Sequence, residues 1–84
     1  MPVIFRDGPY RFRFFSSDLL EPPHIHVQRD RSLCKFWLTS GETASGVVLA
    51  RNRGFADHEL NRIERLVVEY RNQLLEAWHD YFDR

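Results

Sequence analysis

At 84 residues, the chain has room for one domain with a modest hydrophobic core. Its net charge is zero, and its apolar and charged fractions, 43% and 29%, are typical of a soluble globular protein. No apolar run approaches the roughly 18 residues that cross a bilayer, and the first residues lack the pattern of a secretory signal. We therefore expect a cytoplasmic protein without a membrane partner.

Charge is unevenly distributed along the chain. Residues 1–53 carry an excess of basic residues, and residues 54–84 carry an excess of acidic ones. This asymmetry favours an anionic partner for the first part of the chain.

One cysteine, Cys34, excludes an internal disulfide and a metal site built from several thiolates.

Short strands are predicted over about residues 3–49. No repeat, low-complexity tract or linker interrupts the chain, so residues 1–84 are expected to form a single domain. Residues 3–6 precede a turn signal at residues 7–9, and residues 10–14 alternate aromatic with cationic side chains. This alternation is typical of a half-buried strand with its aromatic side chains inward.

Two histidines follow a proline pair, Pro22-Pro23. In an extended segment over residues 24–28, His24 and His26 point to one face, whereas the aliphatic residues between them point to the other. Residues 29–32 are suited to a hairpin connection. The two histidines therefore predict a strand with imidazoles on one face and buried aliphatic side chains on the other.

Residues 33–38 form the next predicted strand, in which Cys34 is interpreted as a core residue. Residues 46–49 form a last strand or lead into a loop at residues 51–55. From about residue 57 to residue 82, apolar residues recur at steps of three and four, which predicts a long amphipathic helix. The expected fold is α+β: a small antiparallel sheet of four to five short strands packed against one long C-terminal helix.

The strand pattern also predicts what the outer face of the sheet carries. If Phe12 and Phe14 point inward, the opposite face holds the two histidines together with Arg11, Arg13, Lys35 and Trp37, and Arg51 and Arg53 lie nearby. Cationic groups neutralise phosphates, and an indole offers a stacking platform for a base. The face is thus suited to RNA, and the alternative is an ordinary solvated surface.

The histidines allow two kinds of chemistry. As an acid and base pair, His24 and His26 could move protons in phosphodiester cleavage, with neighbouring cations stabilising the phosphate and no cofactor. As a His-x-His pair, they could instead bind a metal ion together with Asp18 or Glu21.

Five segments in the same order carry a family resemblance: the neighbourhood of Ser17 and Asp18, Glu21 to Val27, residues 35–38, residues 49–55 and residues 74–82. With these motifs the chain resembles domain-of-unknown-function family 4160. The resemblance implies a short prokaryotic protein that is encoded beside a second small protein and acts as the toxin component of a toxin–antitoxin module. Residues 39–48 depart from the family pattern, as does Ala56, which stands where a hydroxyl helix cap is expected.

The family resemblance and the basic sheet face together predict a toxin component that binds RNA through its histidine and arginine face. Whether it also cleaves RNA, as a metal-independent ribonuclease, is left open by the sequence. One alternative is a non-catalytic protein-interaction module, and a second is a metal-binding domain. The expected partners are a small antitoxin-like protein, RNA and a second copy of the chain. No cofactor is expected.

Overall fold

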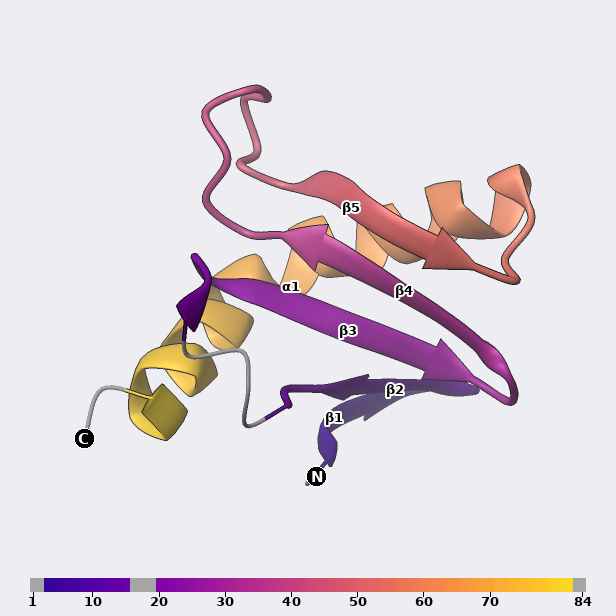
Figure 1. Ribbon diagram of the computed structural model, residues 1–84, viewed down its shortest axis with the longest axis horizontal. Helices are drawn as coiled ribbons and strands as arrows, with labels where there is room; N and C mark the ends of the chain where they lie inside the picture. The colour runs from indigo at the N-terminus through magenta and orange to yellow at the C-terminus, as the bar shows by residue number, and fades with distance from the viewer. Residues whose placement is uncertain (1–2, 16–19, 83–84) are drawn as a thin grey trace.

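A computed structural model describes residues 3–15 and 20–82 of the chain (Figure 1). Within these residues, five strands precede a helix: β1 (Val3–Asp7), β2 (Tyr10–Arg13), β3 (His24–Arg29), β4 (Ser32–Trp37), β5 (Val48–Arg53) and α1 (Asp57–Phe82). The strands pair in chain order, each antiparallel to the next. The predicted α+β fold is confirmed.

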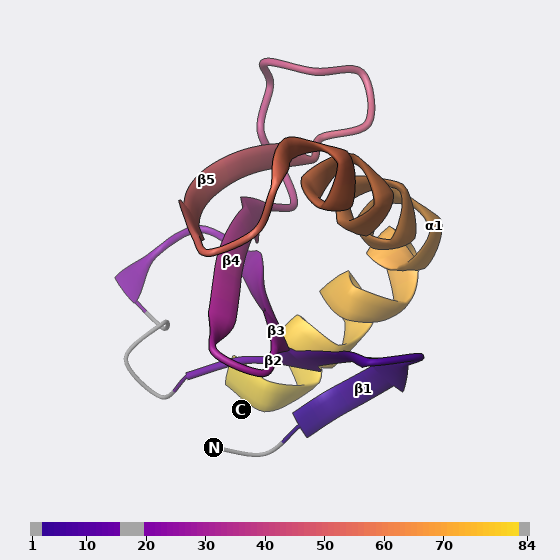
Figure 2. The ribbon, with the colours of Figure 1, turned by 90° about the vertical axis from the view of Figure 1, so that its right-hand side faces the viewer.

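The helix packs against one face of a curved sheet. Figure 2 shows α1 lying along the concave side, with β5 and β2 on either side of it. Aromatic residues at alternate positions of the first part of the chain are buried there, and the Phe12 and Phe14 side chains are fully covered. Phe14 contacts Trp78 of α1 edge to face, at 5.3 Å between ring centroids. The predicted inward face of the sheet is therefore the face that the helix covers.

The boundaries of β5 differ from the prediction. Arg51 and Arg53, predicted to lie in a loop, pair with Lys35 and Leu33 of β4. A bulge at Ala50 separates these pairs from the Leu49 pair with Phe36. Because β5 is an edge strand whose residues after Val48 are exposed, its sequence lacks the alternation that would have identified it.

Two turns reflect local chain chemistry. Arg29 pairs directly with Ser32, so the β3–β4 connection is shorter than predicted, with Asp30 at φ 54°. Asp tolerates this left-handed conformation better than most residues. The peptide bonds of Pro22 and Pro23 are trans, as are all others among the described residues.

Side chains from the sheet hold the start of α1. The carbonyl of Ala56 accepts hydrogen bonds from the Glu59 and Leu60 amides, and these are the first hydrogen bonds of the helix. Glu59, in the first turn of α1, binds the Arg29 guanidinium through two hydrogen bonds of 2.6 and 2.7 Å. It also accepts a hydrogen bond from the Tyr10 hydroxyl at 2.8 Å. The β3–β4 hairpin is thereby tied to the helix.

Two further contacts fix the middle of α1. The Tyr70 hydroxyl donates to Asp7 of β1 at 2.6 Å, and Arg71 Nε donates to the Leu38 carbonyl at 2.7 Å. Both contacts lie near residues 70–72, where the helix continues unbroken.

Within the described part of the chain, no helix has the length and apolar character needed to cross a membrane.

Candidate nucleic-acid interface

Strand register brings most of the predicted RNA-binding residues onto one face of the sheet. Residues directly opposite each other on neighbouring strands share a face. The pairs of Arg13 with His26, His26 with Lys35, and Lys35 with Arg51 form a continuous row across four strands. A second row contains Arg11, Gln28, Leu33 and Arg53.

Arg6 of β1 is a residue that sequence reasoning missed. It pairs with Arg11, so it extends the second row by one strand, and it is exposed. The alternation of β1 could have identified Arg6. Its neighbour Phe5 pairs with the buried Phe12, so the Arg6 side chain points to the opposite face. We define the basic face by these side chains: Arg6, Arg11, Arg13, His26, Lys35, Arg51 and Arg53.

His24 lies on this side of the sheet but is fully buried, so the expectation of two open imidazoles is wrong for this residue. Its ring is enclosed by Trp37 at 5.5 Å and Trp78 at 5.1 Å, because the start of β3 lies beside the C-terminal part of α1 (Figure 1). Its Nδ1 is 2.9 Å from the Pro22 carbonyl. An imidazole in this position supports its neighbours and does not face a ligand.

His26 is half-buried in the middle of the basic face. Its ring contacts Phe15 at 4.4 Å and His24 at 5.1 Å between centroids, both edge to face. The two imidazoles are therefore neighbours, as the His-x-His pattern predicted, but they differ in access to solvent. Of the pair, His26 is the imidazole that a bound molecule can approach.

Lys35 and Trp37 interact with other protein groups. The Lys35 ammonium donates to the Glu21 carboxylate at 2.5 Å and lies over the Trp37 ring, 4.4 Å from its centroid. The same Glu21 oxygen is 3.7 Å from His24 Nε2. One side of the indole predicted to stack on a base is thus covered by a lysine, and that lysine has a carboxylate partner.

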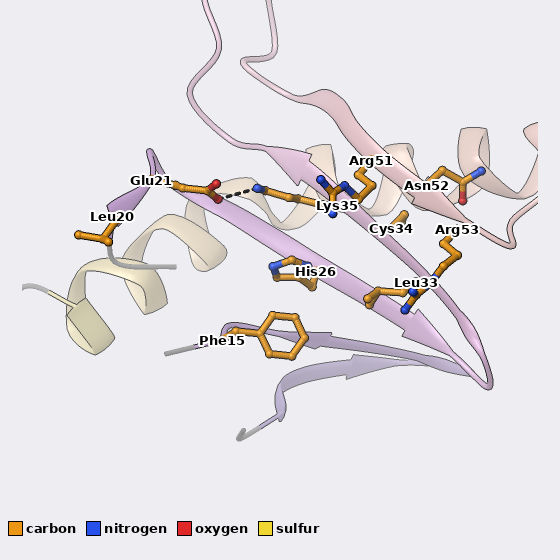
Figure 3. A pocket seen from close by; sticks show the side chains of 10 residues that line it. All are labelled: Phe15, Leu20, Glu21, His26, Leu33, Cys34, Lys35, Arg51, Asn52 and Arg53. Carbon is orange, nitrogen blue, oxygen red and sulfur yellow. Dashed lines mark hydrogen bonds and ion pairs between the residues drawn. The ribbon is translucent and has the colours of Figure 1, made fainter. Parts of the chain in front are cut away.

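A cavity of about 700 Å³ opens on the basic face (Figure 3). Its apolar lining comes from Phe15, Leu20 and Leu33, and its cationic lining comes from Lys35, Arg51 and Arg53. Phe15 directly follows the predicted strand of residues 10–14 and lies beyond the end of β2 in the structure. The alternation of that strand, continued by one residue past the buried Phe14, would have placed Phe15 on the side of the arginines.

Cys34 is a core residue, as predicted. It is 1% exposed, and burial raises the pKa of its thiol to about 12. A thiol with this pKa stays protonated and unreactive at neutral pH.

The metal alternative finds little support in this geometry. Residues 3–15 and 20–82 contain no group of three His, Cys, Asp or Glu side chains placed to hold a metal ion. Asp18, one of the two proposed carboxylate ligands, lies outside the described residues. Glu21, the other, is engaged with Lys35.

Comparison with known proteins identifies the same family that the sequence motifs resemble. The model of a domain of unknown function, DUF4160, matches residues 10–79, which include β2 to β5 and most of α1. A search of curated proteins and a search of solved structures gave no significant match. Because the family model covers well over half of the sequence, the chain belongs to the DUF4160 family.

Proposed function

We propose that the protein binds single-stranded RNA through its basic face, as the toxin component of a cytoplasmic toxin–antitoxin module. The observation that carries the proposal is the row from Arg13 to Arg51, in which adjacent strands each contribute a cationic or imidazole side chain. Neighbouring strands lie about 4.8 Å apart, so the row forms a band of positive charge across the sheet. Such a band attracts the phosphates of a flexible strand without reading its sequence.

Binding is favoured over cleavage by the positions of the two histidines. Metal-independent cleavage of a phosphodiester by this pair needs one imidazole to accept a proton and another to donate one. His24 is fully buried beside the Pro22 carbonyl, whereas His26 is half-buried and lines the cavity. We therefore assign a role in RNA binding to His26 and a positioning role to His24.

A partner protein is the second candidate ligand, and the position of β5 favours it. This strand lies at one edge of the sheet, and most of its side chains are exposed. An extended segment of a small antitoxin-like protein could add to such an edge by backbone hydrogen bonding. That partner would lie beside Arg51 and Arg53, where it would compete with RNA.

Fluorescence anisotropy of a labelled, unstructured RNA oligonucleotide tests RNA binding. If the five arginines of the basic face each neutralise one phosphate, log Kd should change with log salt with a slope of about 3.5. The double variant Arg51→Ala/Arg53→Ala should lower that slope to about 2 and weaken binding at physiological salt.

The matched control is Arg62→Ala/Arg65→Ala, which removes the same charge from exposed positions of α1. We expect this control to bind RNA as the parent chain does. Equal losses in the two double variants would refute the proposed interface, as would the absence of RNA binding by the parent chain. Adding the purified neighbouring gene product to the same assay shows whether the partner competes with RNA for this face.

A further inference from the structure

The cavity on the basic face has two chemically different sides. Phe15 lies on the β2 side of His26, and Lys35 lies on its β4 side, with Arg51 beyond (Figure 3). The aromatic ring is thus separated from the cations by the width of one imidazole. A ligand that satisfies both sides must have a flat apolar part and an anionic group a few ångströms apart.

A nucleotide has this construction. Its base can stack on an aromatic side chain, and its phosphate can bind the cationic side, as in proteins that hold single-stranded nucleic acid. The volume of about 700 Å³ also lies within the range of small-ligand pockets.

The base is not expected to be read by hydrogen bonds from Asn52. This residue lines the cavity, but its side chain donates to the Phe55 carbonyl at 2.9 Å and accepts from the Phe55 amide at 3.1 Å. Its amide is therefore held by the loop that leads into α1. Stacking on Phe15 would accept any base.

Glu21 occupies the position where a phosphate would meet Lys35. Its carboxylate lies 2.5 Å from the ammonium, and its side chain is 44% exposed. A carboxylate bound to a lysine in this way resembles a phosphate oxygen in charge and geometry. An incoming phosphate must displace it.

We propose that this cavity holds one nucleotide unit, with its base against Phe15 and His26 and its phosphate on Lys35 and Arg51, and that Glu21 is a built-in competitor for the phosphate. This inference rests on the proposed RNA binding and identifies the part of the ligand that the cavity recognises. It assigns Glu21 a regulatory role in affinity.

Titration with adenosine 5′-monophosphate, followed by amide chemical shifts in NMR spectra, tests the inference. Resonances of cavity residues should move, whereas adenosine alone and inorganic phosphate alone should bind more weakly. Phe15→Leu, which keeps an apolar side chain but removes the ring, should weaken binding about tenfold. Glu21→Gln should strengthen it about two- to fivefold.

Arg65→Ala on α1 is the control and should bind the nucleotide as the parent chain does. If both cavity variants bind with the parent affinity, or if shifts occur outside the cavity, the nucleotide site is refuted. Failure of this inference is distinguishable from failure of the proposed function. Should RNA binding depend on Arg51 and Arg53 while the mononucleotide does not bind, the basic face would stand without a nucleotide cavity.

Discussion

Replacement of Gly46 by alanine is expected to release the loop after β4 from the helix. Gly46 has φ 81°, a conformation that disfavours side chains. A Cβ atom here would lie 2.9 Å from the Leu38 carbonyl oxygen and 3.0 Å from Arg71 Nη2. Arg71 donates to that same carbonyl, so the added methyl group would push apart the two partners of the 2.7 Å hydrogen bond.

The expected cost has two parts. Alanine in the left-handed region costs roughly 1–2 kcal/mol. Loss of a hydrogen bond from a charged donor adds about 1.5–3 kcal/mol, which partial solvent exposure of Arg71 reduces. We therefore expect Gly46→Ala to lower the free energy of unfolding by about 2–4 kcal/mol, a large share of the stability of a chain this size.

Urea denaturation followed by tryptophan fluorescence measures this effect, and two other glycines provide controls. Gly8 has φ 56° but nothing within 4 Å of an added Cβ, so Gly8→Ala should show the conformational cost alone. Gly41 lacks positive φ and also has nothing within 4 Å, so Gly41→Ala should change stability by less than about 0.5 kcal/mol. If Gly46→Ala costs no more than Gly8→Ala, the contact with Arg71 and Leu38 does not stabilise the loop.

Three further predictions concern titratable groups. The hydrogen bonds from Arg29 hold the pKa of Glu59 below its ordinary value of 4.5, so their stabilising contribution is present above pH 4.5 and is lost as pH falls through the lower folded value. Acid denaturation should therefore begin at higher pH in Arg29→Met. The buried Cys34 thiol, with its pKa raised to about 12, should react with a thiol reagent at pH 8 only when the chain is unfolded by urea. The hydrogen bond to Asp7, together with burial, raises the pKa of Tyr70 from 10.0 to about 12, so stability should decrease between these pH values, and it should decrease less in Tyr70→Phe.

Each of these three predictions has an outcome that would contradict it. An unchanged acid midpoint in Arg29→Met would mean that the ion pair with Glu59 does not affect the acid transition. Rapid modification of Cys34 without urea would show that the thiol is accessible in the folded chain. Identical alkaline profiles for the parent and Tyr70→Phe would exclude the Tyr70–Asp7 hydrogen bond as the source of pH dependence.

Periodicity predicted the parts of the fold that have one buried face. The helix begins at Asp57 and ends at Phe82, within the predicted range, because its apolar stripe continues without interruption. The assignment of Arg11, Arg13 and Lys35 to the outer face followed from the same reasoning and agrees with the strand register. Alternation suffices where one side of a strand is covered and the other is polar.

Tertiary contacts decided the features that the pattern could not predict. Burial of His24 depends on Trp78, which is far away in the sequence and reaches the start of β3 only because α1 extends there. The partner of Lys35 comes from Glu21, in a segment without regular strand alternation. The cavity requires Phe15, β4 and β5 together, and no local pattern contains their relative positions.

Pairing of the strands in chain order also has a consequence for folding kinetics. Each strand pairs with its neighbour in sequence, so sheet formation closes comparatively short loops. The contacts that join distant segments are those of the helix: Tyr10 with Glu59 spans 49 residues, and Tyr70 with Asp7 spans 63. The helix contacts therefore have the largest sequence separations, and docking of α1 is the step in which slow folding variants of this protein should be found.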